Sequence, residues 1–591
     1  MSFWGELKRR RVVRSLTVYL AAAWLVAQIV SEVAVPALGL GDAALRWVAI
    51  LAVLGIPVVA ALSWAFDVSP APLETAASVD PPSSESWLSL RAVVAVVVLL
   101  AVGASLGWIA RSDGESQASG ELDRSVAVLP FESLTGEDDR YLSDGLTEDV
   151  VVALQKAAEL EITGRASTER YRGSGLPPSN VARELGVRYV LTGSVRRAGE
   201  QVRVSVQLHD GRDDRGLWGE QYDQQLTVDN VFEMYTDVAQ SVVTSVRARV
   251  APDAEERLAE RPTESLVAYE RYLRGRSFWT RRLPELMPTA IEFFDRAIEE
   301  DPSYARAHAG RADALLLQGF YLPGDEARQA LRAARQAAAR ALELDAGLAE
   351  AHTSLGYAKW LADWDWTGAE ASLRRALELN PGYSVAHHWL GDLLSQQLRT
   401  REGLSHLDRA LELDPYAVAV HFDKAKALHW AERYEEAVTS FDRVLEIEPT
   451  YFTVTAGLHF DALRGAGRDD EAFRVIARFV EADVGPEAMA ALRAEYEADG
   501  IRAIDDFALE EAAQLLPEEQ DFFFLGSANA TLGRNEEALQ ALRQGVERRS
   551  FFSLTLYASP PIRGLLWGDP RYDELLRGIG LEPSRLTGRP Q

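Results

Sequence analysis

Histidine is the residue of this chain with the clearest capacity for chemistry, because the 591 residues include nine histidines and no cysteine. Regularly spaced imidazoles could bind a metal ion or relay protons. Four of the nine each stand six residues after the end of a repeated phrase; they are His308, His352, His387 and His421. They therefore occupy one equivalent position in successive repeats. This register predicts that they pack in the structure, and a metal-binding ladder is the alternative.

The sequence contains no motif that supports an enzyme. Phosphate-binding loops of the GxxxxGK[ST] type, HExxH zinc motifs and EF-hand loops are absent. One G-x-S-x-G occurs at 103–107, but it lies inside an apolar run, whereas a nucleophile elbow needs a strand before it and a helix after it. The lack of cysteine excludes thiolate catalysis, zinc fingers and iron–sulfur sites. We therefore predict no catalytic residue, no metal ligand and no cofactor.

Length and charge narrow the range of functions further. A chain of 591 residues is too long for one hydrophobic core and indicates three or more units. Its net charge of −27 argues against nucleic acid as a partner, because a phosphate backbone would be repelled. Hydrophobic residues make up 47% of the chain, so we expect folded domains rather than disorder.

One seven-residue phrase recurs through the middle of the chain. It reads RAIEEDP ending at Pro302, RALELDA at Ala346, RALELNP at Pro381, RALELDP at Pro415 and RVLEIEP at Pro449. The last three intervals are 35, 34 and 34 residues, the period of tetratricopeptide helical hairpins. We predict an array of these hairpins over 262–555, less regular at 480–518, with a capping element and tail at 556–591.

Such arrays coil into a superhelix whose inner surface binds other proteins. The repeat register places ten residues of the inner helices toward that groove, and we predict that they bind a protein or peptide partner. We expect the aromatic members to be partly exposed, although several could instead pack internally. The ten are Thr353, Tyr357, Trp360, His388, Asp392, Gln396, Phe422, Lys426, His429 and Trp430.

The amino-terminal part contains three apolar runs, which predict transmembrane helices at 16–36, 47–66 and 92–110. A cleaved signal peptide is the alternative for the first run. The basic cluster between Lys8 and Arg14 predicts a cytoplasmic amino terminus. Three crossings would place residues 112–591 on the far side of the membrane, anchored by the spans. The polar segment 112–123 is typical of a linker.

Residues 124–250 show a different pattern, with strands and helices in the order β-α-β-α-β-β-β-α. The predicted strands include SVAVLPF at 125–131 and QVRVSVQLHD at 201–210. Between the first two strands, Ser143 or Asp144 is expected to cap a helix. The pattern predicts an α+β domain.

The phrases VAVLPF, YLSDGLTEDV, GVRYVLTGSV and LWGEQYD in this segment resemble the TolB amino-terminal-like and FlgO-like domains of bacteria. The resemblance implies a bacterial inner-membrane protein with tetratricopeptide repeats. It also implies kinship with the carboxyl-terminal part of some bacterial adenylate cyclases and kinases. The predicted fold class is thus multidomain: three transmembrane helices, an α+β TolB-like domain and an all-α tetratricopeptide superhelix.

The functional prediction is a non-enzymatic, membrane-anchored scaffold that binds protein partners on the periplasmic side. The alternative is a transmembrane sensor or regulatory subunit that signals to a separate cytoplasmic enzyme. A third interpretation is a chain that looks like a cyclase only through the shared region, because no segment before the spans is long enough for a catalytic domain. The partner and the oligomeric state do not follow from the sequence.

Overall fold

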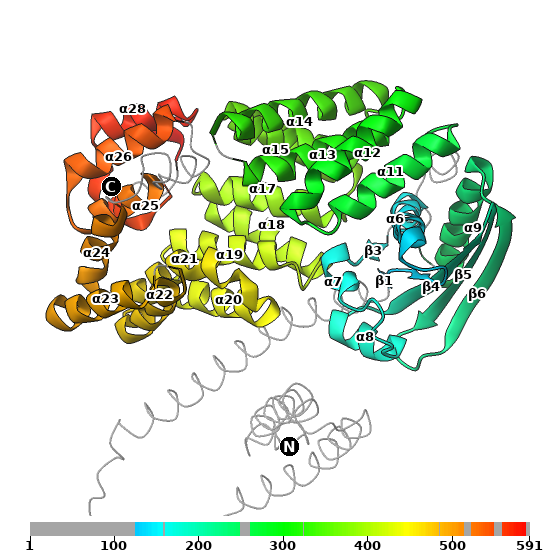
Figure 1. Ribbon diagram of the computed structural model, residues 1–591, viewed down its shortest axis with the longest axis horizontal. Coiled ribbons are helices and arrows are strands. Elements are labelled where there is room, and N and C mark those ends of the chain that lie inside the picture. The colour runs from blue at the N-terminus through cyan, green and yellow to red at the C-terminus, as the bar shows by residue number, and fades with distance from the viewer. Residues whose placement is uncertain are drawn as a thin grey trace, which may run out of the picture. The chain divides into compact units, whose positions relative to one another are not determined.

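The computed structural model describes residues 124–157, 160–246, 248, 261–322, 324–483, 485–512, 522–548 and 558–586. The chain divides into two compact units, Met1–Glu121 and Leu122–Gln591, and all described residues belong to the second. Within it, Figure 1 shows a mixed sheet with helices, here called the module, followed by a long run of helical hairpins, here called the array.

The membrane part of the predicted fold class is corrected by the structure. Among the described residues, no helix is both long enough and apolar enough to cross a bilayer. The longest of them, α14 (Gly324–Leu344), has 21 residues but carries charged side chains along its length, whereas a spanning helix needs about 20 mostly apolar ones. The predicted inner-membrane location, with residues 112–591 periplasmic, is corrected on the same finding. The predicted spans themselves lie outside the described residues, at 16–36, 47–66 and 92–110.

The module is built on a sheet with the strand order β3-β1-β4-β5-β6, and a short strand β2 pairs with β4. Strands β1, β3 and β4 are parallel, and β4, β5 and β6 form an antiparallel meander. The bounds are β1 Ser125–Val128, β2 Glu132–Ser133, β3 Glu161–Ile162, β4 Tyr189–Ala198, β5 Gln201–Asp210 and β6 Gly216–Gln225.

Both faces of the sheet are covered, as the alternation of side chains in β1 shows. Val126 and Val128 pack into the core under α6 (Arg140–Ala157) and α9 (Val228–Val246). Ala127 points to the opposite face and joins a small cluster with α8 (Pro178–Leu185). This two-sided burial explains why β1 is apolar along its length.

The start of α6 differs from the sequence prediction. The helix begins at Arg140, directly after a short 3₁₀ turn, so Ser143 and Asp144 lie inside it and are buried. The Ser143 hydroxyl donates to the Arg140 carbonyl instead of capping the helix. Strand β2 and helix α7 (Arg165–Glu169) were not predicted, because segments of two and five residues carry no measurable periodicity.

The array consists of consecutive antiparallel hairpins, drawn from green to red in Figure 1. A π-helical turn at Lys359–Asp363 interrupts the third hairpin. The bounds are α11 Leu266–Trp279, α12 Met287–Glu300, α13 Ala305–Tyr321, α14 Gly324–Leu344, α15 Ala349–Ala358, α16 Trp366–Leu379, α17 Ser384–Gln396, α18 Thr400–Leu413, α19 Val418–Trp430, α20 Tyr434–Ile447, α21 Phe452–Gly465, α22 Asp469–Asp483, α23 Pro486–Asp499, α24 Ala503–Ala512, α25 Phe522–Thr531, α26 Asn535–Glu547, α27 Pro560–Leu566 and α28 Pro570–Gly578.

A small residue on one helix faces a large residue on the other at the seam of each regular hairpin. Gly391 of α17 approaches Leu407 of α18 so closely that an added Cβ would lie 2.7 Å from the leucine side chain. Gly356 faces Leu373 in the same way, and both leucines are fully buried. The burial of both leucines places them in the seam between the paired helices. Close helix contact explains the need for glycine here.

We expect Leu407→Ala to lower the free energy of unfolding by about 2–5 kcal/mol, because it leaves a cavity in a seam that cannot collapse. The measurement is urea denaturation followed by circular dichroism. Leu283→Ala is the matched control, since 46% of this leucine is exposed, and it should change stability by less than about 0.5 kcal/mol. Equal losses in the two variants would show that the seam is misassigned.

Candidate functional site

The carboxylates of α6 in the module face arginines of the array. Asp149 accepts a hydrogen bond from the Arg306 guanidinium at 2.8 Å and another from the Tyr269 hydroxyl. One position earlier in the chain, Glu148 forms an ion pair with Arg276. The Asp149 side chain is only 1% exposed, and the side chains of Glu148, Arg276 and Arg306 are also largely buried. Glu148 and Asp149 of the YLSDGLTEDV phrase therefore bind the array.

A second contact joins the other end of the module to the array. Asp414, which follows α18, accepts hydrogen bonds from the backbone N–H of Ser167 at 2.8 Å and of Ala166 at 3.3 Å. The Gly164 N–H donates to the Leu413 carbonyl at 2.7 Å. The array thus supplies the amino-terminal cap of α7 in the module. Burial raises the pKa of Asp414, although the hydrogen bonds from Ser167 act in the opposite direction.

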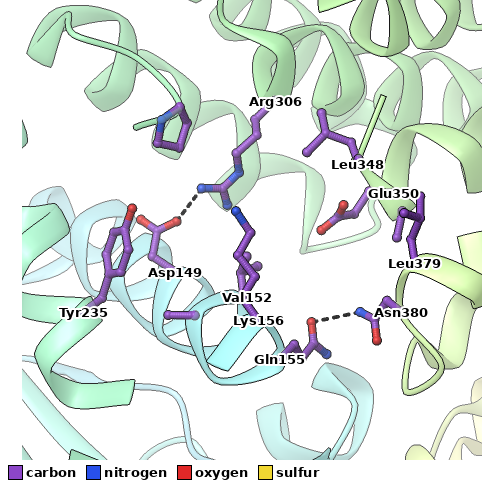
Figure 2. A pocket seen from close by; sticks show the side chains of 14 residues that line it. Asp149, Val152, Gln155, Lys156, Tyr235, Arg306, Leu348, Glu350, Leu379 and Asn380 are labelled. Atoms are coloured by element: carbon purple, nitrogen blue, oxygen red, sulfur yellow. Dashed lines mark hydrogen bonds and ion pairs between the residues drawn. The ribbon is translucent and has the colours of Figure 1, made fainter. Parts of the chain in front are cut away.

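A small pocket lies beside the Asp149–Arg306 contact, as Figure 2 shows. Asp149 and Arg306 meet on one side of it, and the Asn380 amide donates to the Gln155 side chain at 3.2 Å on the other. Lys156 extends between them, opposite Glu350. The cavity measures about 70 Å³, far below the roughly 300–1,000 Å³ of typical ligand sites. We conclude that this pocket is part of a structural junction.

The predicted groove residues were assigned to the inner helices α15, α17 and α19, and the structure connects six of the ten. Asp423, which was not predicted, joins them: its carboxylate contacts His388 at 2.7 Å and Lys426 at 2.5 Å. Lys426 also pairs with Asp392 at 3.0 Å, and Gln396 donates to Asp392 at 3.1 Å. The Lys426 ammonium lies over the rings of Phe422 and Trp430.

This network contains two carboxylates, Asp392 and Asp423, and one side chain that stays positively charged, Lys426. Burial raises the pKa of Asp392, and the neighbouring Asp423 raises it further. Burial also works against ionisation of Asp423, but Lys426 and His388 outweigh it and lower the Asp423 pKa to about 2. Lys426 keeps its proton, because the two carboxylates raise its pKa against the effect of burial. The inner surface therefore presents an ordered ionic network.

The expected exposure of the predicted aromatic residues is wrong for three of four. Tyr357 is 7% exposed, Trp360 1% and Trp430 2%, while Phe422 is partly exposed as expected. Tyr357 is covered because its ring stacks on Trp389 at 4.1 Å. Trp360 and Trp430 are buried in an apolar cluster that includes α27 and α28. Their role in partner binding stays a prediction.

The remaining predicted residues lie apart from the network. Thr353 is buried and its hydroxyl donates to the Ala349 carbonyl of its own helix. His429 is also buried, and its ring packs against Tyr434. Neither contact directs a side chain toward a partner.

Sequence reasoning missed the apolar side chains that are exposed near these helices. Phe320 and Tyr321, at the end of α13, are 40% and 54% exposed. The Phe320 ring contacts Tyr357, which in turn stacks on Trp389, so three successive inner helices form an aromatic row. The sequence signal for these exposed side chains was the long 44-residue interval between the phrases ending at Pro302 and Ala346. Phe320 and Tyr321 lie within this interval, at the end of α13.

The four equivalent histidines have one common role. In each, the ring Nε2 lies 2.9–3.2 Å from the carbonyl of the residue six positions earlier, at the end of the preceding outer helix; the pairs are His308–Pro302, His352–Ala346, His387–Pro381 and His421–Pro415. A carbonyl only accepts, so Nε2 must carry the proton. Burial lowers the pKa of all four, that of His387 to about 4, which keeps them neutral near pH 7.

Comparison with known proteins separates the module from the array. Residues 122–239 match the family model for the second domain of HilA/YgeH-like transcriptional regulators. Residues 388–451, from α17 to the turn after α20, match a tetratricopeptide-repeat model. The array is a tetratricopeptide superhelix. These matches do not include the TolB-like and FlgO-like families, so that resemblance of the module stays a prediction.

One curated relative is "Putative adenylate cyclase 3" of Rhizobium meliloti (strain 1021), 36% identical over 186 residues. The match covers 31% of this chain and 31% of that protein, so the chain spans less than a third of the relative's length.

Among solved structures, the tetratricopeptide protein YrrB, described as having an unusual peptide-binding site, is 20% identical, with 34% of this chain and 97% of that chain covered and a TM-score of 0.26. A thermophilic tetratricopeptide protein of Thermus thermophilus is 17% identical, with coverage of 34% and 98% and a TM-score of 0.27. A tetratricopeptide protein of Parabacteroides merdae is 13% identical, with coverage of 54% and 100% and a TM-score of 0.30. The assignment of the superhelix depends on the family model and on the hairpins themselves.

We expect Gly164→Ala to weaken the junction, because an added Cβ would collide with the Asp414 carboxylate. The loss should be about 1–3 kcal/mol of unfolding free energy, as for other overpacked sites. Gly216→Ala is the control, since a Cβ there meets open space. Urea denaturation of both variants provides the measurement, and a Gly164 variant as stable as the control would argue against the assigned contact.

The histidine contacts predict that acid destabilises the array. The folded pKa of His387 is about 4 and that of an unfolded histidine about 6.5, so the unfolded chain binds more protons and stability falls as pH drops through this interval. His387→Phe should retain the fold, lose about 1 kcal/mol at pH 7 with the hydrogen bond, and show a shallower decline below about pH 6.5. Melting temperatures measured from neutral to acidic pH test this, and parallel curves would contradict it.

Proposed function

We propose that this protein is a non-enzymatic scaffold whose tetratricopeptide array binds a protein or peptide partner. The observation that carries the proposal is the inner surface of α13, α15, α17 and α19, where exposed aromatic side chains adjoin an ordered ionic network. Aromatic residues beside fixed polar groups are typical of binding hot spots. The tetratricopeptide match over 388–451 supports the same interpretation.

The proposed binding surface combines the two features that give affinity and orientation. Phe320 and Tyr321 offer apolar area that is lost from water only when a partner covers it. Asp423 and Lys426 lie on another inner helix and are already held by their mutual ion pair. Because these groups are ordered before a partner arrives, binding costs little side-chain entropy.

The module serves in this proposal as a rigid support for the array. It is joined to α11 and α13 through Glu148 and Asp149, and to α18 through Gly164. The family description of its match refers to transcriptional regulators. The net charge of −27 makes direct binding of nucleic acid by this chain a poor fit, so we propose a protein-directed role for the module as well.

The name of the Rhizobium meliloti relative suggests a second candidate, a regulatory region shared with cyclases. Since the match covers less than a third of that protein, the shared part does not need to be the catalytic one. We propose that this chain corresponds to a non-catalytic region of the relative. In this second candidate the chain is a regulatory subunit that contacts a separate enzyme through the same inner surface.

We expect the double variant Phe320→Ala, Tyr321→Ala to lose at least about tenfold in partner affinity, the equivalent of about 1.4 kcal/mol. Both side chains are exposed, so the melting temperature should stay the same. The assay selects binding peptides from a display library of the source organism's proteome on the full chain, then measures the affinity of each for the variants.

Leu134→Ala is the control, because this leucine of the module is 51% exposed and distant in sequence from the groove. Peptides that bind the double variant and the control equally well would refute the inner surface as the binding site. Formation of cyclic AMP from ATP by the purified chain would contradict the non-enzymatic part of the proposal.

A further inference from the structure

The carboxyl-terminal segment contacts the array far from the hairpin that it follows. We define the closing segment as residues 559–581, which include α27 and α28, and the tryptophan surface as Trp360, Trp364, Trp366 and Trp430. The Trp366 indole donates to the Ile579 carbonyl at 2.7 Å. Arg563 donates to the Trp430 carbonyl at 2.6 Å and pairs with Glu432 at 3.2 Å. In Figure 1 the red α28 lies beside the end of the green α14 and α15.

The contact is specific in its backbone geometry. Gly580 has a φ of +80°, and a Cβ there would lie only 2.6 Å from the Trp364 carbonyl. No other residue type fits this position without moving the two backbones apart. Ile562, Leu566 and Ile579 are all but fully buried in one apolar cluster with the tryptophans. The closing segment thus occupies the tryptophan surface as a bound ligand would.

A terminal cap alone does not explain this arrangement. A cap needs only to cover the exposed face of the last hairpin, and the closing segment does so by packing α27 and α28 against α25 and α26. Trp366 and Trp430 belong to hairpins much earlier in the chain. Their coverage by the closing segment is additional to capping.

The fit of the closing segment is incomplete in its hydrogen bonds. In the part of the chain that the structure describes, the buried indole N–H groups of Trp360 and Trp430 have no hydrogen-bond partner, and neither does the Tyr572 hydroxyl of the closing segment itself. Trp360 is 1% exposed and Trp430 2%. Buried donors without partners weaken an association. An occupant that offered acceptors to the two indoles would bind this surface better.

We propose that the tryptophan surface is a second protein-binding surface of the array, and that the closing segment is its intramolecular competitor. The partner would be an apolar helical segment that carries hydrogen-bond acceptors, such as a side-chain amide or carboxylate, for Trp360 and Trp430. Its binding would displace the closing segment. This rests on the proposed function only in assuming that the array binds proteins, because the surface is separate from Phe320 and Tyr321.

Opening of the closing segment can be measured directly, because the chain has no cysteine. Thr367→Cys and Arg577→Cys, both at exposed positions, provide two labelling sites for distance measurement by electron spin resonance. We expect one short distance in the otherwise unchanged chain and a second, longer one in Gly580→Ala. Gly564→Ala is the matched control, since this glycine of α27 has open space around it, and should retain the single short distance.

The probe for the vacated surface is a fluorescent synthetic peptide of residues 559–581. We expect it to bind full-length Gly580→Ala at least tenfold more tightly than the unchanged chain or Gly564→Ala. Trp366→Phe removes the indole donor together with part of a buried ring. It covers the case in which Gly580→Ala fails to fold, because it should also give the second, longer distance. Equal peptide affinity in all chains, or an unchanged distance in both weakened variants, would overturn the proposal.

A separate experiment tests the chemistry of the proposed partner. A negative result there would not bear on the proposed binding surface at Phe320. Trp430→Phe removes a donor that the closing segment leaves without a partner. We therefore combine Trp430→Phe with Trp366→Phe and compare two peptides, the original probe and a probe with an added acceptor, such as Leu565→Gln. Trp430→Phe should weaken the binding of the Leu565→Gln probe more than that of the original probe. Equal weakening of the two peptides would show that the indole does not select acceptors.

Discussion

The buried ionic contact between α6 of the module and the first hairpins of the array is the constraint on which the rest of this structure depends. Removing Glu148 and Asp149 from water is costly, and the guanidinium groups of Arg276 and Arg306 compensate for it. Without the array, Glu148 and Asp149 would lack these arginine partners, and without the module, Arg276 and Arg306 would lack these carboxylates. The module and the array are therefore parts of one folded unit, and the position of α13, with its aromatic end, follows from that of α6.

Along the array, one repeat geometry is maintained by two small devices. A glycine or alanine lets the paired helices approach, and a neutral histidine ties the start of each inner helix to the end of the preceding outer helix. The second device uses the histidine Nε2–H as a hydrogen-bond donor. Its cost is sensitivity to acid, because protonation must occur in a partly buried site.

One part of the array surface is exposed, and another part is already covered by the closing segment of the same chain. Phe320 and Tyr321 remain exposed for a partner in the proposed function, whereas Lys426 of the ionic network is buried. The tryptophan surface is occupied by the closing segment, which is attached by buried apolar side chains, by hydrogen bonds of Trp366 and Arg563, and by the close backbone approach at Gly580. A scaffold with one open and one covered surface could bind two partners under different conditions.

The sequence by itself determined the repeats and the order of the main strands and helices of the module, because period and alternation are local properties of the chain. It also identified inner-helix residues such as His388, Asp392 and Lys426, which the structure joins into one network. The membrane prediction, which used hydropathy and the basic cluster between Lys8 and Arg14, is contradicted, because no described helix is both long enough and apolar enough to cross a bilayer.

Only the tertiary structure decided that Trp360 and Trp430 are buried and that the acidic residues of α6 face arginines of the array. The residues that meet in these contacts stand far apart in the chain, by 133 positions for Trp430 and Arg563 and by 157 for Asp149 and Arg306. A repeat period or an alternation of side chains describes one segment and carries no information about which distant surface will cover it.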